Sequence, residues 1–139
     1  MNALMVNNLY KLIESTEIDA EVGVRVEHLS GNEQYSLFGA EIPPHKVLSA
    51  HYHNQGDEIY LIMEGSGIMY VGEVDDSENV TWEQPFNISK GDCFSVGAKK
   101  VHQLCNHTDH KLVAVFGTSK SHLSTDRIIL KGHTQEACH

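Results

Sequence analysis

The sequence predicts an all-β fold, a sandwich or barrel of antiparallel strands with a short helix or arm at its N-terminus. Apolar residues recur at every second position in several segments, the period of a half-buried strand. These segments are short, clusters of Gly, Pro, Asn and Asp separate them at regular intervals, and no long segment has helical spacing. At 139 residues the chain fits one domain, whose core we expect at 22–130, with a loose tail at 131–139.

The first third of the chain predicts a helix and two strands. Residues 7–16 carry apolar side chains at mixed helical spacing, so we expect a short helix or arm there. From Val22 the period changes to two, which predicts a strand up to a turn at 30–32. A second strand is expected at 34–42, because the prolines that follow cannot donate to a sheet.

The rest of the chain predicts further short strands. Strands at 47–53 and 58–63 flank the turn formers of 54–57, which suit a hairpin. Later strands are expected at 68–74, 80–88, 94–96, 101–105, 112–117 and 128–130. Residues 121–127 predict a turn of helix, and for their polar side chains we favour a structural role, as a helix cap or a dimer salt bridge, over substrate binding.

Composition excludes several classes of partner. A net charge of -9 with only two arginines would repel nucleic acid. We find neither an apolar run long enough for a membrane span nor a secretory signal, so the expected location is the cytoplasm. The three cysteines are odd in number and form no Cys-x-x-Cys pair, which favours reduced thiols.

Three histidines and a glutamate predict a metal site. His51 and His53 lie two apart on a predicted strand, so both imidazoles point to the same side. A hairpin at 54–57 would return Glu58 to the side of His53, where its carboxylate could join a divalent ion. His102 follows a glycine-opened loop half a chain away and would be the fourth ligand.

Two segments resemble the paired motifs of the cupin superfamily. The first motif, Gly-x5-His-x-His-x(3,4)-Glu-x6-Gly, matches from His51 to Gly65, with His45 in place of the opening glycine. The second, Gly-x5-Pro-x-Gly-x2-His-x3-Asn, matches at Gly91, His102 and Asn106. Gly97 replaces its proline and Lys99 its second glycine, departures that concern the shape of the loops.

The resemblance implies a double-stranded β-helix, a jelly-roll barrel of two packed sheets, that holds one metal ion and dimerises with a second copy. Its ligands would be His51, His53, Glu58 and His102, and the ion would be Fe, Mn, Ni, Co or Zn. Four protein ligands leave about two open positions on an octahedral ion. One carboxylate leaves the site positively charged, which favours a small anionic or oxygen-rich organic ligand.

Three functions agree with such a site. The leading hypothesis is a metal-dependent dioxygenase acting on a small organic substrate, in which Glu58 also relays a proton. The second is an isomerase, epimerase or lyase acting on a sugar or sugar acid. The third is a metal-dependent ligand-binding module, such as a sensor, without catalysis.

Strand alternation also nominates residues of the substrate pocket. Tyr60 and Ile62 share a face with Glu58, and Leu104 shares one with His102. Tyr35 and Leu37 could line the cavity from another strand, although packing is the favoured interpretation for both. His45 is expected near the rim and could contact substrate, although residues in turns are usually solvated.

Overall fold

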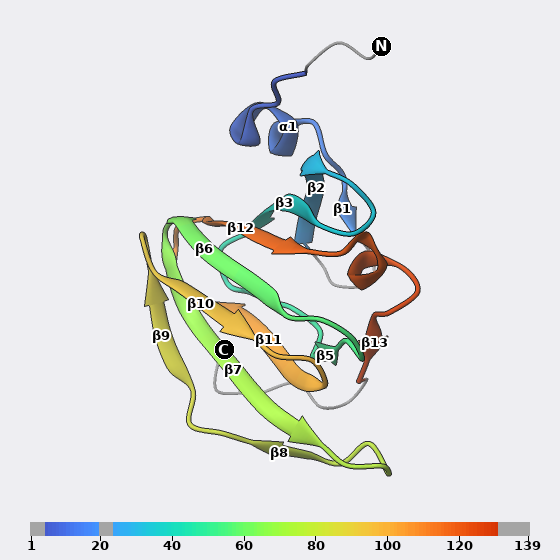
Figure 1. Ribbon diagram of the computed structural model, residues 1–139. Coiled ribbons are helices and arrows are strands. Elements are labelled where there is room, and N and C mark those ends of the chain that lie inside the picture. The colour runs from blue at the N-terminus through green and yellow to red at the C-terminus, as the bar shows by residue number, and fades with distance from the viewer. Residues whose placement is uncertain (1–4, 20–23, 131–139) are drawn as a thin grey trace.

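Two antiparallel sheets face each other in the computed structural model, which describes residues 5–19 and 24–130 (Figure 1). The first sheet has six strands in the order β1-β2-β3-β12-β6-β10. Their bounds are β1 Ile18–Asp19, β2 Val24–Gly31, β3 Ser36–Ile42, β12 Leu112–Thr118, β6 Glu58–Glu64 and β10 Cys93–Val96.

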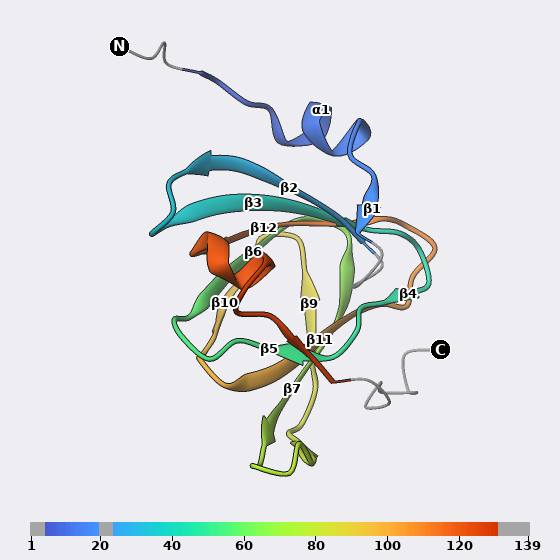
Figure 2. The ribbon, with the colours of Figure 1, turned by 90° about the vertical axis from the view of Figure 1, so that its right-hand side faces the viewer.

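The second sheet has the strand order β13-β5-β11-β7-β8, with β4 also pairing with β11 and β9 with β7. Their bounds are β4 Lys46–Val47, β5 His51–Tyr52, β7 Ser66–Val74, β8 Val80–Trp82, β9 Phe86–Ser89, β11 Lys100–Asn106 and β13 Ile128–Ile129. Figure 2 shows the two sheets as opposite walls around a common interior. The prediction of an all-β barrel of antiparallel strands is confirmed.

Alternation along the strands decides what faces this interior. On β6, Glu58, Tyr60 and Ile62 are buried, whereas Ile59 and Leu61 are exposed on the outside. Because successive side chains of a strand point to opposite faces, this one strand supplies both a carboxylate to the interior and an apolar surface to the exterior.

The N-terminal helix α1, Leu9–Glu14, covers the outer face of β2 and β3 (Figure 2). The side chain of Asn8 caps it by accepting hydrogen bonds from the Tyr10 and Lys11 amides, both at 3.1 Å. Leu9 lies so close to Gly39 of β3 that a Cβ there would collide with it. The expected N-terminal helix is therefore present, and it is shorter at both ends.

Three predicted elements were wrong in detail. The expected strand at 47–53 is two strands, β4 and β5, with residues 48–50 outside both. Residues 54–57 are not a hairpin, because β5 and β6 belong to different sheets and the chain crosses between them. The expected strand at 80–88 is divided into β8 and β9 near Pro85, which cannot donate to a sheet ladder.

The described residues test the prediction of reduced thiols but not those for the two ends of the expected core. Residues 22–23 and the tail expected at 131–139 lie outside the described residues. Cys93 is free and exposed, but Cys105 takes part in a disulfide bond, so the prediction of reduced thiols is wrong for Cys105. No helix in the described ranges is long and apolar enough to cross a membrane.

Two residues that stand where the motifs have glycine adopt the left-handed backbone conformation that usually requires glycine. His45 has φ 57° and Lys99 has φ 64°, both in the left-handed region. Side chains reach this region at a cost of about 1–2 kcal/mol, which the surrounding structure must offset. The loop conformation is thus retained although the glycines are not.

Candidate metal centre

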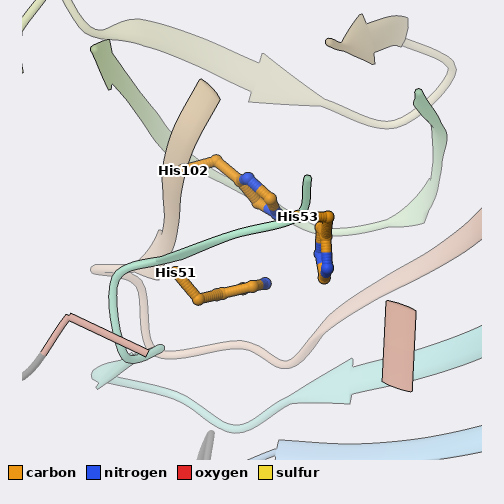
Figure 3. A group of neighbouring side chains, drawn as sticks. All are labelled: His51, His53 and His102. Atoms are coloured by element: carbon orange, nitrogen blue, oxygen red, sulfur yellow. The ribbon is translucent and has the colours of Figure 1, made fainter. Parts of the chain in front are cut away.

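The structure brings together the four residues expected to bind a metal, and Figure 3 shows the three histidines among them. His51 lies in β5, His53 directly follows it, Glu58 begins β6, and His102 pairs with His51 from β11. All four are buried, none more than 6% exposed. The nitrogens that the three histidines offer lie within 4.8 Å of one another, and these residues could hold a metal ion.

Backbone carbonyls fix the tautomer of all three imidazoles. In each ring Nδ1 faces a carbonyl oxygen, which can only accept a hydrogen bond, so Nδ1 carries the proton and Nε2 bears a lone pair. The pairs are His51 with Ser49 O at 2.9 Å, His102 with Lys100 O at 3.1 Å, and His53 with Asp126 O. Such carbonyl partners orient metal-binding histidines.

Two of the three inward nitrogens have no hydrogen-bond partner among the described residues. Within the described part of the chain, Nε2 of His53 and Nε2 of His102 are buried without a hydrogen bond. His53 Nε2 lies 2.7 Å from Glu58 Oε2, but the two atoms do not have hydrogen-bond geometry. Buried lone pairs that converge on a carboxylate are unfavourable unless a cation lies among them, so the donor set fits a divalent transition metal.

The carboxylate of Glu58 is held in its ionised form. Tyr60 Oη donates to Oε1 at 2.6 Å, and His122 Nδ1 lies 2.8 Å from Oε2. Burial alone would raise the pKa of Glu58, but the imidazoles of His102, His122 and His53 bring that pKa well below its ordinary value. Burial, with the charge of Glu58, raises the pKa of Tyr60 well above 10, so its hydroxyl remains a donor.

His122 is a functional candidate that sequence reasoning missed. It lies in the 3-10 helix η1, Lys120–Leu123, and is 1% exposed. Its Nε2 donates to the carbonyl of Gln55, its Nδ1 lies 2.6 Å from Thr118 Oγ1, and its ring stacks on His53 at 4.1 Å. His53, Glu58 and His122 form a second group that could hold a metal. A single buried turn has no periodicity that would have marked it.

Asp126 ties the end of the described chain to the metal-site loop. Its carboxylate accepts hydrogen bonds from the amides of Asn54 at 2.8 Å and Gln55 at 3.0 Å. Burial would raise the pKa of Asp126, but these two amides lower it. Asp126 thus holds the loop after His53 in place, and within the described residues no side chain caps η1, so the expected helix cap is not found there. Arg127 forms an ion pair with Asp19 of the same chain.

An apolar cavity lies over the candidate metal site between the two sheets. Its volume is about 560 Å³ when the open space at its mouth is counted. Besides Tyr60, Leu104 and the polar residues of the site, its walls include Val26, Ile42, Leu48, Ala114, Phe116 and Leu123. The surface offered to a ligand is mostly hydrocarbon.

Four of the six expected pocket residues lie elsewhere. Ile62 is buried, but it packs in the core beyond the cavity. Tyr35 and Leu37 are 54% and 40% exposed and lie over Gly117 on the outer face, outside the cavity. His45 lies at the surface, paired with Asp109 at 2.6 Å. Only Tyr60 and Leu104 line the cavity.

We predict that the metal-free protein is most stable near pH 6.5. Burial, then the neighbouring His102, lowers the pKa of His51 well below 6.5. As the pH falls below 6.5 the unfolded chain therefore binds a proton that folded His51 does not, which costs up to about 1.4 kcal/mol per pH unit. Burial would lower the pKa of His122, but Glu58 and the Gln55 carbonyl raise it above 6.5. The stabilisation that protonated His122 gives the folded protein is therefore complete below pH 6.5, and it is lost as the pH rises through the pKa of His122 in the folded state.

Urea unfolding of metal-free protein between pH 5 and 8.5 would measure this profile. In the His51→Gln variant, stability should no longer fall below pH 6.5. In the His122→Gln variant, stability should no longer fall as the pH rises above 6.5. A wild-type profile that rises steadily across the whole range would contradict the assignment.

Comparisons with known proteins agree with this fold. Residues 39–117 match the family model of the Cupin domain. No curated protein matches the chain. Among solved structures, a double-stranded β-helix protein from Klebsiella pneumoniae is similar at TM-score 0.67 and 12% identity, over 93% of this chain and 99% of that one. A Cupin 2 conserved barrel protein from Salinispora arenicola gives 0.64 and 17%, over 89% and 95%.

A third similar structure is CapF with the inhibitor 3-isopropenyl-tropolone, at TM-score 0.64 and 15% identity. It is similar over 83% of this chain, which spans only 33% of the length of CapF. CapF from Staphylococcus aureus is described as a capsular polysaccharide assembling protein. At these identities the likeness concerns the fold.

Proposed function

The chain belongs to the cupin family, and from this premise we propose that it is a metal-dependent dioxygenase acting on a small organic molecule. The observation that carries the proposal is a buried group of three imidazoles beside an ionised carboxylate. The nitrogens that His51, His53 and His102 offer lie within 4.8 Å of one another, and His53 Nε2 and His102 Nε2 lie 2.7 Å and 3.6 Å from the Glu58 carboxylate. We assign His51, His53, Glu58 and His102 as the ligands of one divalent ion.

The donor set leaves room for chemistry. Four protein ligands on an octahedral ion such as Fe, Mn, Ni or Co leave about two positions, and Zn would also accept these donors. When bound, such an ion polarises substrate oxygens and, if redox-active, supports reaction with dioxygen. Around it, the apolar walls exclude water, while Tyr60 and His122 hold the two oxygens of Glu58. Glu58 is the group we assign to relay a proton at the reacting oxygen.

Adjacent oxygens are the substrate feature that such a site favours. Tropolone, the parent of the inhibitor found with CapF, carries a hydroxyl beside a carbonyl and can chelate a metal through both. A ligand of this kind would use both open positions. The apolar walls offer few partners for the many hydroxyls of a sugar, which favours the dioxygenase over the sugar isomerase.

Oxygen uptake tests the proposal. Protein loaded anaerobically with each metal would be screened in an oxygen electrode with diols, enediols and diketones. We expect uptake with at least one metal and none with the His51→Ala variant. Product formation without oxygen would instead indicate an isomerase or lyase. Tight ligand binding without product would indicate a sensor.

We also propose that two copies associate through the outer face of the six-stranded sheet. Leu37, Ile59 and Leu61 are exposed there, and cross-strand pairing through Gly117 makes Leu37 and Ile59 neighbours. Contiguous exposed apolar surface marks an interaction site, and a two-fold axis would place the same patch on both sides.

The Ile59→Glu variant is expected to be monomeric, because it would bury two charges at the centre of that interface. Sedimentation velocity of the wild type and the variant would measure the change. Gln84→Glu, with the same change of charge at an exposed position between β8 and β9, should remain dimeric. A monomeric wild type would refute the dimer.

A further inference from the structure

Arg127 is placed at the open edge of the barrel, beside the candidate metal site. In β13 and β5, Ile129 pairs with His51 and Ile128 with Tyr52, so the preceding position lies level with His53. Ile129 packs into the core between the sheets. By strand alternation the side chain of Arg127 points to the same side, and it lines the cavity.

An ion pair joins Arg127 to the opposite sheet. Its Nη1 lies 3.1 Å from Asp19 Oδ2, and Asp19 belongs to β1, the edge strand of the six-stranded sheet, whereas β13 is an edge of the other (Figure 2). The Arg127 side chain is 8% exposed and that of Asp19 33%. The guanidinium is therefore inside and its carboxylate partner is at the surface.

The cavity is lined by one permanently cationic side chain and one acidic side chain. Among the described residues that line it, Arg127 is the only lysine or arginine and Glu58 the only acid. Glu58 already interacts with Tyr60, His122 and the imidazoles. A ligand in this cavity thus meets the metal-binding group, hydrocarbon walls and one guanidinium.

We propose that the ligand is a carboxylate with a hydrocarbon body, whose carboxylate binds Arg127 while its chelating oxygens occupy the metal site. This rests on the proposed function for the metal-binding end. A guanidinium matches a carboxylate with two parallel hydrogen bonds, and the ligand would bind beside Asp19 or in its place. A phosphate would need more cationic partners than one arginine provides.

Calorimetry with Ni(II)-loaded protein under argon tests the proposal. The probes are catechol, which only chelates, and 3,4-dihydroxybenzoate and 3,4-dihydroxyphenylacetate, which add a carboxylate at two distances. We expect at least one carboxylate to bind the wild type 10-fold more tightly than catechol. In Arg127→Gln this preference should fall below 2-fold while catechol affinity stays unchanged.

Two further variants separate charge from structure. Arg127→Lys should keep part of the preference for a carboxylate probe over catechol, because lysine keeps the positive charge but cannot donate two parallel hydrogen bonds. Asp19→Asn breaks the same ion pair without removing the guanidinium, and it should keep or increase the preference. A preference that survives in Arg127→Gln, or is absent from the wild type, would overturn the proposal.

A probe without chelating oxygens makes the outcome independent of the metal. Phenylacetate should bind metal-free wild type at millimolar concentration, seen as chemical-shift changes in NMR spectra, and should not bind Arg127→Gln. If catechol fails to bind but phenylacetate behaves in this way, the metal-site proposal fails and the carboxylate site stands. If catechol binds only when the metal is present and neither carboxylate binds more tightly than catechol, the metal site stands and the carboxylate site at Arg127 fails.

Discussion

The His51→Ala variant is expected to lose stoichiometric metal binding while keeping its barrel. The substitution removes one of three inward Nε2 atoms, and the two remaining imidazoles and Glu58 leave the coordination incomplete. β5 is a two-residue strand, so few sheet hydrogen bonds depend on this side chain. Metal content after equilibration with one equivalent of ion, together with far-UV circular dichroism, would measure both effects.

An exposed histidine supplies the matched control. His107 follows β11 at the surface, and His107→Ala should bind metal like the wild type. Unchanged stoichiometry in His51→Ala would show that the ligand assignment is wrong. If His122→Ala lost the ion instead, the metal would lie in the group of His53, Glu58 and His122.

The Glu58→Gln variant is expected to bind the metal at least 100-fold more weakly, about 2.7 kcal/mol. Glutamine keeps the size of the side chain but removes the one negative charge that lies among the inward nitrogens. Loss of even an outer hydrogen-bond partner costs 10–100-fold in metal affinity, and a charged ligand should cost more. Competition with a chelator of known affinity would give the two dissociation constants.

Glu73→Gln is the corresponding control, because Glu73 is an exposed glutamate of β7 paired with Lys100 at the surface. Its metal affinity should equal that of the wild type. If Glu58→Gln bound the metal with an affinity within tenfold of the wild type, the Glu58 carboxylate would not be a ligand.

The same substitution should also change how the stability of the metal-free protein depends on acid pH. The contribution of ionised Glu58 to stability is complete above about pH 4.5, is lost as the pH falls through its lower folded pKa, and is absent in the variant.

The sequence was sufficient for the barrel and for the four residues now assigned to the metal. Strand alternation is local, so it could be read along β6 from Glu58 to Ile62 without knowing what each face meets. The two motif segments supplied the long-range information that alternation lacks, since they predicted that His102 lies beside His51 although more than a third of the chain separates them.

Sheet membership could not be read in the same way. Nothing local distinguishes a turn that forms a hairpin from one that crosses between sheets, and residues 54–57 do the latter. Tyr35 could be named only as a possible cavity residue, because alternation alone does not tell the inner face of a strand from the outer, and its side chain lies exposed on the outer face. Each contact of Asp126 has a backbone group on one side: its carboxylate accepts from the Asn54 and Gln55 amides, and its carbonyl accepts from His53. Backbone groups leave no pattern in the sequence that would predict such contacts. Arg127 carried no such signal either, because the three residues that follow it, Ile128, Ile129 and Leu130, are all apolar and do not alternate.

The contacts of Asp126 set the order in which the site can form during synthesis. His53 leaves the ribosome more than 70 residues before the carbonyl that fixes its tautomer and ring orientation. A nascent chain would therefore carry the motif histidines without a preorganised site, and metal capture would follow the closing of the barrel by the segment after β12. Pulse-chase metal labelling of stalled chains would find the ion only after Asp126 has emerged.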